Sequence, residues 1–141
     1  MSAAGRAGYL WDSDVCVDLL NRRRAEPLVR LLRETRDDGI AISAVTYGEV
    51  YEGVLFSAMP AIAARRWEQV SRIFQVLDFT PEIAVVWADI RGKLRRSGMR
   101  VPDNDLMIAA TAILFDLTLV TRNVRHFERL IDIRLTDASD L

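Results

Sequence analysis

A chain of 141 residues, half of them apolar and 28% charged with a net charge of −1, has the size and composition of one globular domain with a buried core. The single cysteine, Cys16, cannot form a disulfide within the chain, which favours a reducing cytoplasm. With the single histidine, His126, it leaves too few ligands for the usual zinc cluster. A bound metal would therefore need oxygen ligands, which suits Mg²⁺ or Mn²⁺. No apolar run is long enough for a membrane span, and the first residues lack the apolar core of a signal peptide.

Short apolar runs alternate along the chain with segments in which apolar residues recur at helical spacing. The predicted strands are 8–11, 40–42, 75–79, 117–121 and 131–135. The predicted helices are a short one from Asp12 to about residue 20, then 26–36, 44–56, 60–74, 81–96, 106–115 and 126–130. We expect residues 1–7 to form an N-terminal tail and 8–141 a single domain. This alternation is typical of an α/β fold in which helices cover both faces of a mainly parallel sheet.

Acidic and amide side chains follow several of the predicted strands. Right-handed crossovers place the carboxyl ends of parallel strands at one edge of the sheet, where ligands bind in such folds. The residues expected at that edge are Asp12, Glu49, Asp103, Asp105 and Asn123. Asp12 at a strand tip could be a metal ligand, a nucleophile or a base. Clustered carboxylates repel one another, and a divalent cation would relieve that repulsion.

Several of these acidic residues also have a purely structural interpretation. Asp103 follows a proline and could cap the next helix instead of binding metal, and Asp14 is predicted to cap the helix after the first strand. Asp105 would interact favourably with the helix dipole with or without a metal. Asp18 is expected at a polar helix position. Ser43 is a further predicted N-cap, at the end of the second strand.

Four segments together resemble a known family. They are 9–15 (YLWDSDV), 43–50 (SAVTYGEV), 105–112 (DLMIAATA) and 119–127 (LVTRNVRHF). In this order and spacing the chain resembles PIN-domain nucleases, and among them the VapC-type toxins of bacterial toxin–antitoxin pairs. The resemblance covers nearly the whole chain. It implies a three-layer α/β/α sandwich and Mg²⁺- or Mn²⁺-dependent cleavage of RNA by an endoribonuclease.

The resemblance also implies roles for individual residues. Asp12 and Asp105 match the family's direct metal ligands, and Glu49 matches a ligand that acts directly or through water. Asn123 matches a last position where some members carry aspartate, so an asparagine there makes a second tightly held metal doubtful. Asp103 is the remaining candidate ligand.

Neighbouring residues and partners follow from the same resemblance. Thr121, or Ser13 beside the first aspartate, would hydrogen-bond the metal-binding carboxylates. The implied partners are an RNA substrate, a cognate antitoxin that occludes the site, and a second copy of the chain in a homodimer. All but one of the 19 basic residues are arginine. Apart from the resemblance, several arginines lie beside the acidic segments and either contact the RNA backbone or form solvated helix ends. They are Arg95, Arg96 and Arg100 before the segment that begins at Asp103, and Arg122 and Arg125 after the fourth predicted strand.

Two other functions fit parts of the same pattern. Asp12-Ser13-Asp14-Val15 also looks like the Asp-x-Asp motif of HAD-type phosphatases, with Asp12 as the nucleophile. That family needs a lysine from a later segment, and the one lysine, Lys93, falls within a predicted helix. Alternatively, Asn123 in place of a carboxylate is compatible with a PIN-like module that binds RNA or a partner without cleavage. His126 is expected to be structural or adjacent to RNA rather than catalytic.

Overall fold

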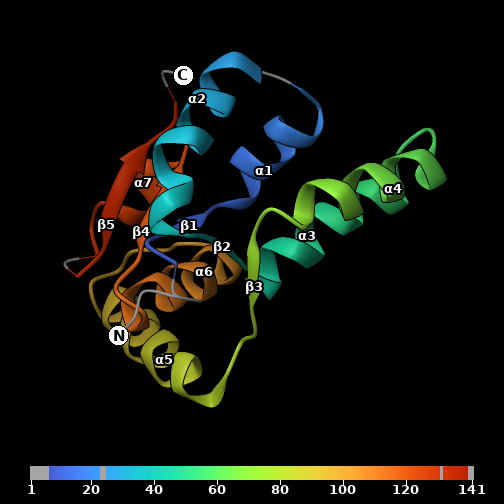
Figure 1. Ribbon diagram of the computed structural model, residues 1–141. Helices are drawn as coiled ribbons and strands as arrows, with labels where there is room; N and C mark the ends of the chain where they lie inside the picture. The colour runs from blue at the N-terminus through green and yellow to red at the C-terminus, as the bar shows by residue number, and fades with distance from the viewer. Residues whose placement is uncertain (1–6, 23–24, 131, 140–141) are drawn as a thin grey trace.

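The computed structural model describes residues 7–22, 25–130 and 132–139, and Figure 1 shows a central sheet with helices on both sides. Of the predicted N-terminal tail, residues 1–6 lie outside this description, as does Ile131 at the start of the last predicted strand. In this described part of the chain, five strands run parallel in the order β3-β2-β1-β4-β5. They are β1 (Tyr9–Trp11), β2 (Ile40–Ser43), β3 (Gln75–Leu77), β4 (Thr118–Thr121) and β5 (Arg134–Asp137).

The helices divide between the two faces of the sheet. They are α1 (Ser13–Leu20), α2 (Ala25–Thr35), α3 (Ala44–Leu55), α4 (Pro60–Ser71), α5 (Pro81–Arg96), α6 (Asp103–Leu114) and α7 (Val124–Phe127), with the short 3-10 helix η1 (Arg36–Asp38). Helices α1 to α4 contribute to the core on one face, and α5, α6 and α7 to the core on the other. Figure 1 shows α3 and α4 as a hairpin that projects beyond the sheet. Within the described residues, no helix is both long and apolar enough to cross a membrane.

Alternate residues of the central strands enter different cores. Trp11 and Val120 pack with α1 to α4, whereas their neighbours Leu10 and Leu119 pack with α5 and α6. Side chains of a strand point to opposite faces in turn, so a strand covered on both faces must be apolar at every position. The short apolar segments from which these strands were predicted are indeed apolar at successive positions. The predicted three-layer α/β/α sandwich is confirmed, and its described strands are all parallel.

The register brings the ends of neighbouring strands together. Trp11 pairs with Val120, and the Asp12 amide donates to the Val120 carbonyl at 2.8 Å. Asp12 therefore lies beside Thr121 where both strands end. At the end of β2 the Ser43 hydroxyl accepts from the amide of the second residue of α3 at 3.0 Å, which confirms the predicted cap.

Some predicted boundaries and caps are wrong. The last strand begins at Arg134, and the helix expected at 126–130 lies at Val124–Phe127. The cap of α1 is Asp12 rather than Asp14, because the Asp12 side chain itself accepts from the Ser13 amide. Helix α6 begins at Asp103 with Pro102 in the cap position, so Asp103 is not a cap but part of the first helical turn.

Candidate metal centre at the carboxyl edge of the sheet

Asp12 is held by hydrogen bonds on both of its carboxylate oxygens. Oδ1 accepts from the Ser13 amide at 2.8 Å, and Oδ2 accepts from the Thr121 hydroxyl at 2.7 Å. The first bond forms because α1 begins directly after the strand, and the second because β4 is the neighbour of β1. The side chain is 4% exposed. Its orientation is thus fixed by the sheet register and by the start of a helix.

Burial makes the negative charge on Asp12 unfavourable. Loss of water around the carboxylate, and the nearby carboxylates of Asp14 and Asp105, raise the pKa of Asp12 to about 7, although the hydrogen bonds from Thr121 and Ser13 oppose the shift. Burial also raises the pKa of Asp14. A cation beside Asp12 would favour its ionised form. Near neutral pH this carboxylate is therefore poised to bind one.

Glu49 joins the site through two neighbouring elements. Ser13 Oγ donates to Glu49 Oε1 at 2.7 Å and lies 3.1 Å from the Thr46 hydroxyl. Asn104 Nδ2, from the first turn of α6, donates to Glu49 Oε2 at 3.3 Å. The carboxylate of α3 is thereby connected to α1 on one side and to α6 on the other. Ser13 was predicted to hydrogen-bond one of the metal-binding carboxylates, and its hydroxyl donates to Glu49.

Asp105 and Asn123 reach the same edge from α6 and from the loop after β4. Asp105 Oδ2 lies 2.5 Å from His126 Nδ1. The backbone N–H of Asn123 donates to the Thr121 hydroxyl at 2.9 Å, and that hydroxyl in turn donates to Asp12. Sequence reasoning gave His126 no contact with a candidate ligand. The contact depends on how α7 sits after β4, for which a single sequence carries no signal.

Two predicted site residues are engaged in other contacts. Asp103 forms an ion pair with Arg91 of α5, in which Arg91 Nε lies 2.8 Å from Asp103 Oδ1. The Arg122 guanidinium pairs with Asp18, which is 3% exposed, while the Arg122 amide donates to Asp14 Oδ2 at 3.3 Å. The expectation that Asp18 is an ordinary polar helix position is therefore wrong: it is a buried ion-pair partner.

The comparisons with known proteins concern the family and the fold of the whole chain. A family model described as PIN domain matches residues 9–132. The chain belongs to the PIN-domain family. Ribonuclease VapC2 of Haemophilus influenzae is 32% identical over 127 residues, which cover 89% of this chain and 94% of that protein. The resemblance inferred from four sequence segments is confirmed.

Solved structures show the same PIN-domain fold. DNA-bound VapBC from Salmonella typhimurium matches with a TM-score of 0.87 and 28% identity, over 93% of this chain and 98% of that chain. VapBC-5 from Mycobacterium tuberculosis, a member of the VapBC family of toxin–antitoxin systems, matches with a TM-score of 0.69 and 25% identity, over 93% and 99% of the two chains.

The side chains of this PIN domain match the chemistry of a hard divalent cation. Among the described residues, no three acidic, histidine or cysteine side chains are close enough to form a complete metal site by themselves. Mg²⁺ commonly binds through one or two carboxylates and keeps several waters, so it does not need such a group. All the candidate donors are oxygens, and the most buried of them, Asp12, has a raised pKa. A two-carboxylate site completed by water fits these residues.

The phosphatase alternative does not fit. Lys93, the one lysine of the chain, pairs with Asp89 at 2.9 Å on the exposed surface of α5. Its side chain is 73% exposed, and its ion-pair partner lies one turn earlier on the same helix. A HAD-type mechanism lacks its lysine at the strand tip.

Proposed function

We propose that this PIN domain is a divalent-metal-dependent endoribonuclease that hydrolyses phosphodiester bonds in RNA. The observation that carries the proposal is the buried Asp12 at the end of β1, whose pKa is raised to about 7 beside further oxygen donors. Ribonuclease VapC2, a relative that aligns with most of the chain, supports the same activity. A buried carboxylate with a raised pKa is unfavourable in a purely structural position, so its presence at the sheet edge favours a functional role for Asp12.

Asp12 and Asp105 are the proposed direct ligands of Mg²⁺ or Mn²⁺, and Glu49 and Asn123 would complete the site directly or through water. Bound there, the cation would lower the pKa of a water and stabilise charge on the phosphoryl oxygens. Asp103, predicted as a further ligand, is not included because Arg91 engages it.

The surrounding residues orient the proposed ligands. Thr121 fixes one oxygen of Asp12, and Ser13 fixes one oxygen of Glu49, so each carboxylate keeps a free lone pair on a defined side. His126 does the same for Asp105. Partners of this kind hold ligands in position and are themselves important for metal affinity. The proposed site is therefore preorganised by hydrogen bonds from α1, β4 and α7.

We also propose that the chain is the toxin of a toxin–antitoxin pair, with a cognate antitoxin as its protein partner and a homodimer as its assembly. VapBC-5, from a family of toxin–antitoxin systems, supports this proposal. Large apolar side chains are exposed at the tip of the α3–α4 hairpin, namely Leu55, Phe56 and Met59. Apolar surface of this kind is typical of a protein contact.

The test is cleavage of single-stranded RNA by the purified protein, with Mg²⁺ and with EDTA. We expect cleavage only with the metal, and its loss in Asp12→Asn. The matched control is Asp116→Asn, which removes a carboxylate that is 80% exposed and lies two residues before β4, away from the carboxyl edge. Asn also tolerates the positive φ of 56° at that position. Full cleavage in EDTA would refute the proposal, and RNA binding without cleavage would favour a non-catalytic module.

A further inference from the structure

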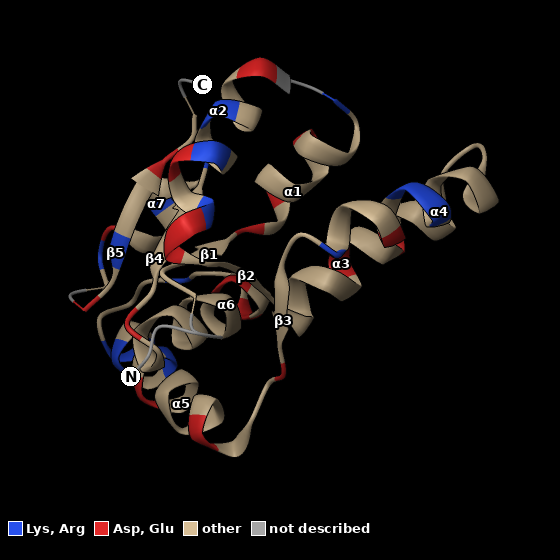
Figure 2. Ribbon diagram, viewed as in Figure 1, with Lys and Arg blue, Asp and Glu red and all other residues tan. Residues whose placement is uncertain are grey.

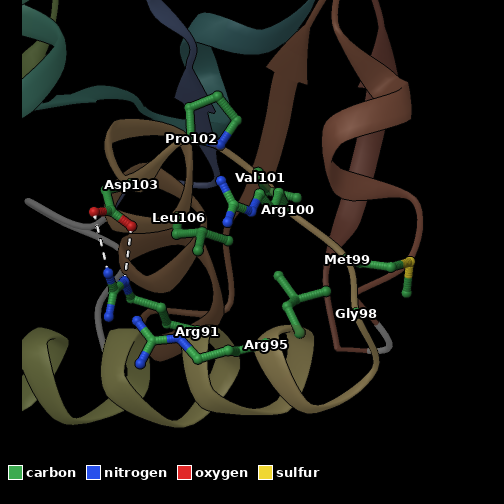
Figure 3. Close-up of a pocket in the computed structure, with 10 residues that line it drawn as sticks. Arg91, Arg95, Gly98, Met99, Arg100, Val101, Pro102, Asp103 and Leu106 are labelled. Atoms are coloured by element: carbon green, nitrogen blue, oxygen red, sulfur yellow. Dashed lines mark hydrogen bonds and ion pairs between the residues drawn. The ribbon is translucent and has the colours of Figure 1, made fainter.

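A second feature lies on the other side of the first turn of α6. It is a pocket of about 870 Å³ between the end of α5, the loop 97–102 and the start of α6. Figure 3 shows the side chains of Arg91 and Arg95 reaching from α5 toward this space and Arg100 reaching into it from the loop. The volume is within the range of pockets that enclose a small molecule or a nucleotide.

The pocket carries excess positive charge. The described residues that line the pocket include three arginines and one aspartate, which leaves an excess of two positive charges. They are Arg91, Arg95, Arg100 and Asp103. Arg91 is bound on both sides: it pairs with Asp103 at 2.8 Å, and its guanidinium carbon lies 5.2 Å from the centre of the Trp87 ring. Within the described part of the chain, no ion pair engages Arg95 or Arg100. Figure 2 shows basic residues gathered along the end of α5.

The rest of the lining is apolar. Leu94 and Leu106 are buried beneath the pocket, and Met99 and Val101 come from the loop. A guanidinium group can donate two parallel hydrogen bonds to two oxygens of one phosphate. Apolar side chains can contact the faces of bases and sugars. A pocket with both kinds of lining fits a nucleotide better than a simple anion.

The pocket and the carboxylate cluster share one helical turn. Successive residues of an α-helix are rotated by about 100° and rise by about 1.5 Å, so Asp103 and Asp105 point to nearly opposite sides of α6 and lie only about 3 Å apart along its axis. Accordingly, Asp103 contacts Arg91 of α5, whereas Asp105 contacts His126. Asn104, between them, contacts Glu49. A single-stranded nucleic acid that crosses the start of α6 would reach both the pocket and the carboxylate cluster.

We propose that this pocket binds a phosphate-bearing nucleotide of the RNA substrate adjacent to the one that is cleaved, with Arg95 and Arg100 contacting its phosphate. The inference rests on the proposed ribonuclease function and assigns it a substrate-binding subsite. The carboxylate cluster repels a polyanion, and the arginines beside it offset that repulsion where the strand continues. RNA is favoured over an acidic peptide because the pocket adjoins the cleavage site and has room for a base beside the phosphate.

The test is binding of a labelled single-stranded RNA in EDTA, where no cleavage is expected, measured by fluorescence anisotropy over a range of salt concentrations. In Arg95→Gln/Arg100→Gln we expect binding about tenfold weaker, with the salt slope reduced by about 1.4, or roughly 0.7 for each lost phosphate contact. The control is Arg30→Gln/Arg33→Gln, which removes two exposed charges from α2 and should bind RNA as the wild type does. Each of the two double variants removes two positive charges, so they change the net charge equally.

A third variant tests the pocket in the opposite direction. Asp103→Asn removes the one carboxylate and releases Arg91, so RNA binding should become tighter. Equal binding by the two double variants would overturn the inference, as would a loss of antitoxin binding with RNA binding intact, which would assign the pocket to an acidic peptide. Wild-type protein that cleaves RNA while Arg95→Gln/Arg100→Gln binds it normally refutes only this subsite. Wild-type protein that neither binds nor cleaves RNA refutes the ribonuclease function itself.

Discussion

The carboxyl edge of the sheet and the pocket lined by Arg91, Arg95 and Arg100 lie on opposite sides of the first turn of α6. The two regions differ in the sign and the burial of their charged side chains. At the sheet edge Asp12 is 4% exposed and hydrogen-bonded on both oxygens. In the pocket Arg95 and Arg100 are exposed. A buried charge is costly unless it is compensated, whereas an exposed charge is well solvated and screened by salt. The first region therefore suits a tightly placed cation, and the second suits a long polyanion.

Asp103 and Asp105 provide the sharpest way to separate the two regions. We expect Asp105→Asn to lower the rate of RNA cleavage at saturating Mg²⁺ by at least about a hundredfold, because removing a metal ligand should cost at least as much as removing one of its hydrogen-bond partners. Asp103→Asn should keep cleavage and lower the RNA concentration that gives half the maximal rate. Single-turnover cleavage kinetics measure both quantities.

The exposed Asp116→Asn variant is the control for the loss of a carboxylate elsewhere. An equal loss of the maximal rate in Asp103→Asn and Asp105→Asn would restore Asp103 as a metal ligand. It would also remove the distinction between the two sides of α6.

The arginines of the two regions should differ in their effect on stability. Arg122 compensates the buried Asp18, so Arg122→Met should lower the free energy of unfolding by about 2 kcal/mol, less than for a fully buried pair because the Arg122 side chain is 38% exposed. Arg95→Gln/Arg100→Gln should change it by less than about 0.5 kcal/mol. Urea unfolding in EDTA measures both. If the two variants are equally stable, the Arg122–Asp18 pair is only a surface contact.

The sequence predicts features that depend on neighbours along the chain. Asp12 at a strand tip follows from the apolar run before it, and Ser43 as a cap follows from the helical spacing after it. The sequence predicts Asp105 in the first helical turn but leaves Asp103 as a cap or a metal ligand, whereas α6 begins at Asp103 itself. This difference conceals the fact that Asp103 and Asp105 face opposite sides, because the direction of a side chain depends on where the helical phase begins.

Contacts between distant segments could not be predicted from one sequence. Asp18 and Arg122 are 104 residues apart, and Asp105 and His126 are 21 apart on either side of β4. Both pairs depend on sheet register and on the rotation of α1 and α7, which local spacing does not specify. The grouping of Asp12, Glu49 and Asp105 was predicted only because parallel strands end at one edge and because four segments resemble PIN-domain nucleases.

The central claim is that the buried Asp12 belongs to a divalent-cation site. The most direct measurement is the free energy of unfolding between pH 5 and pH 8, in EDTA and in excess Mn²⁺, for wild type and Asp12→Asn. The pKa of Asp12 is raised from 3.8 to about 7 in the folded protein, so the native state binds more protons between these values. In EDTA the wild type should lose stability as the pH rises toward and through about 7, by an amount on the order of 3 kcal/mol. Asp12→Asn should lose much less, and the remaining loss comes from Asp14, whose pKa burial also raises.

Mn²⁺ should restore stability to the wild type at pH 8, by roughly 2 to 3 kcal/mol at a hundredfold excess over its dissociation constant. It should have little effect at pH 5, where Asp12 is protonated, and little effect on Asp12→Asn at either pH. Equal stabilisation of both proteins by Mn²⁺ at pH 8 would contradict the account, because the cation would then bind without Asp12.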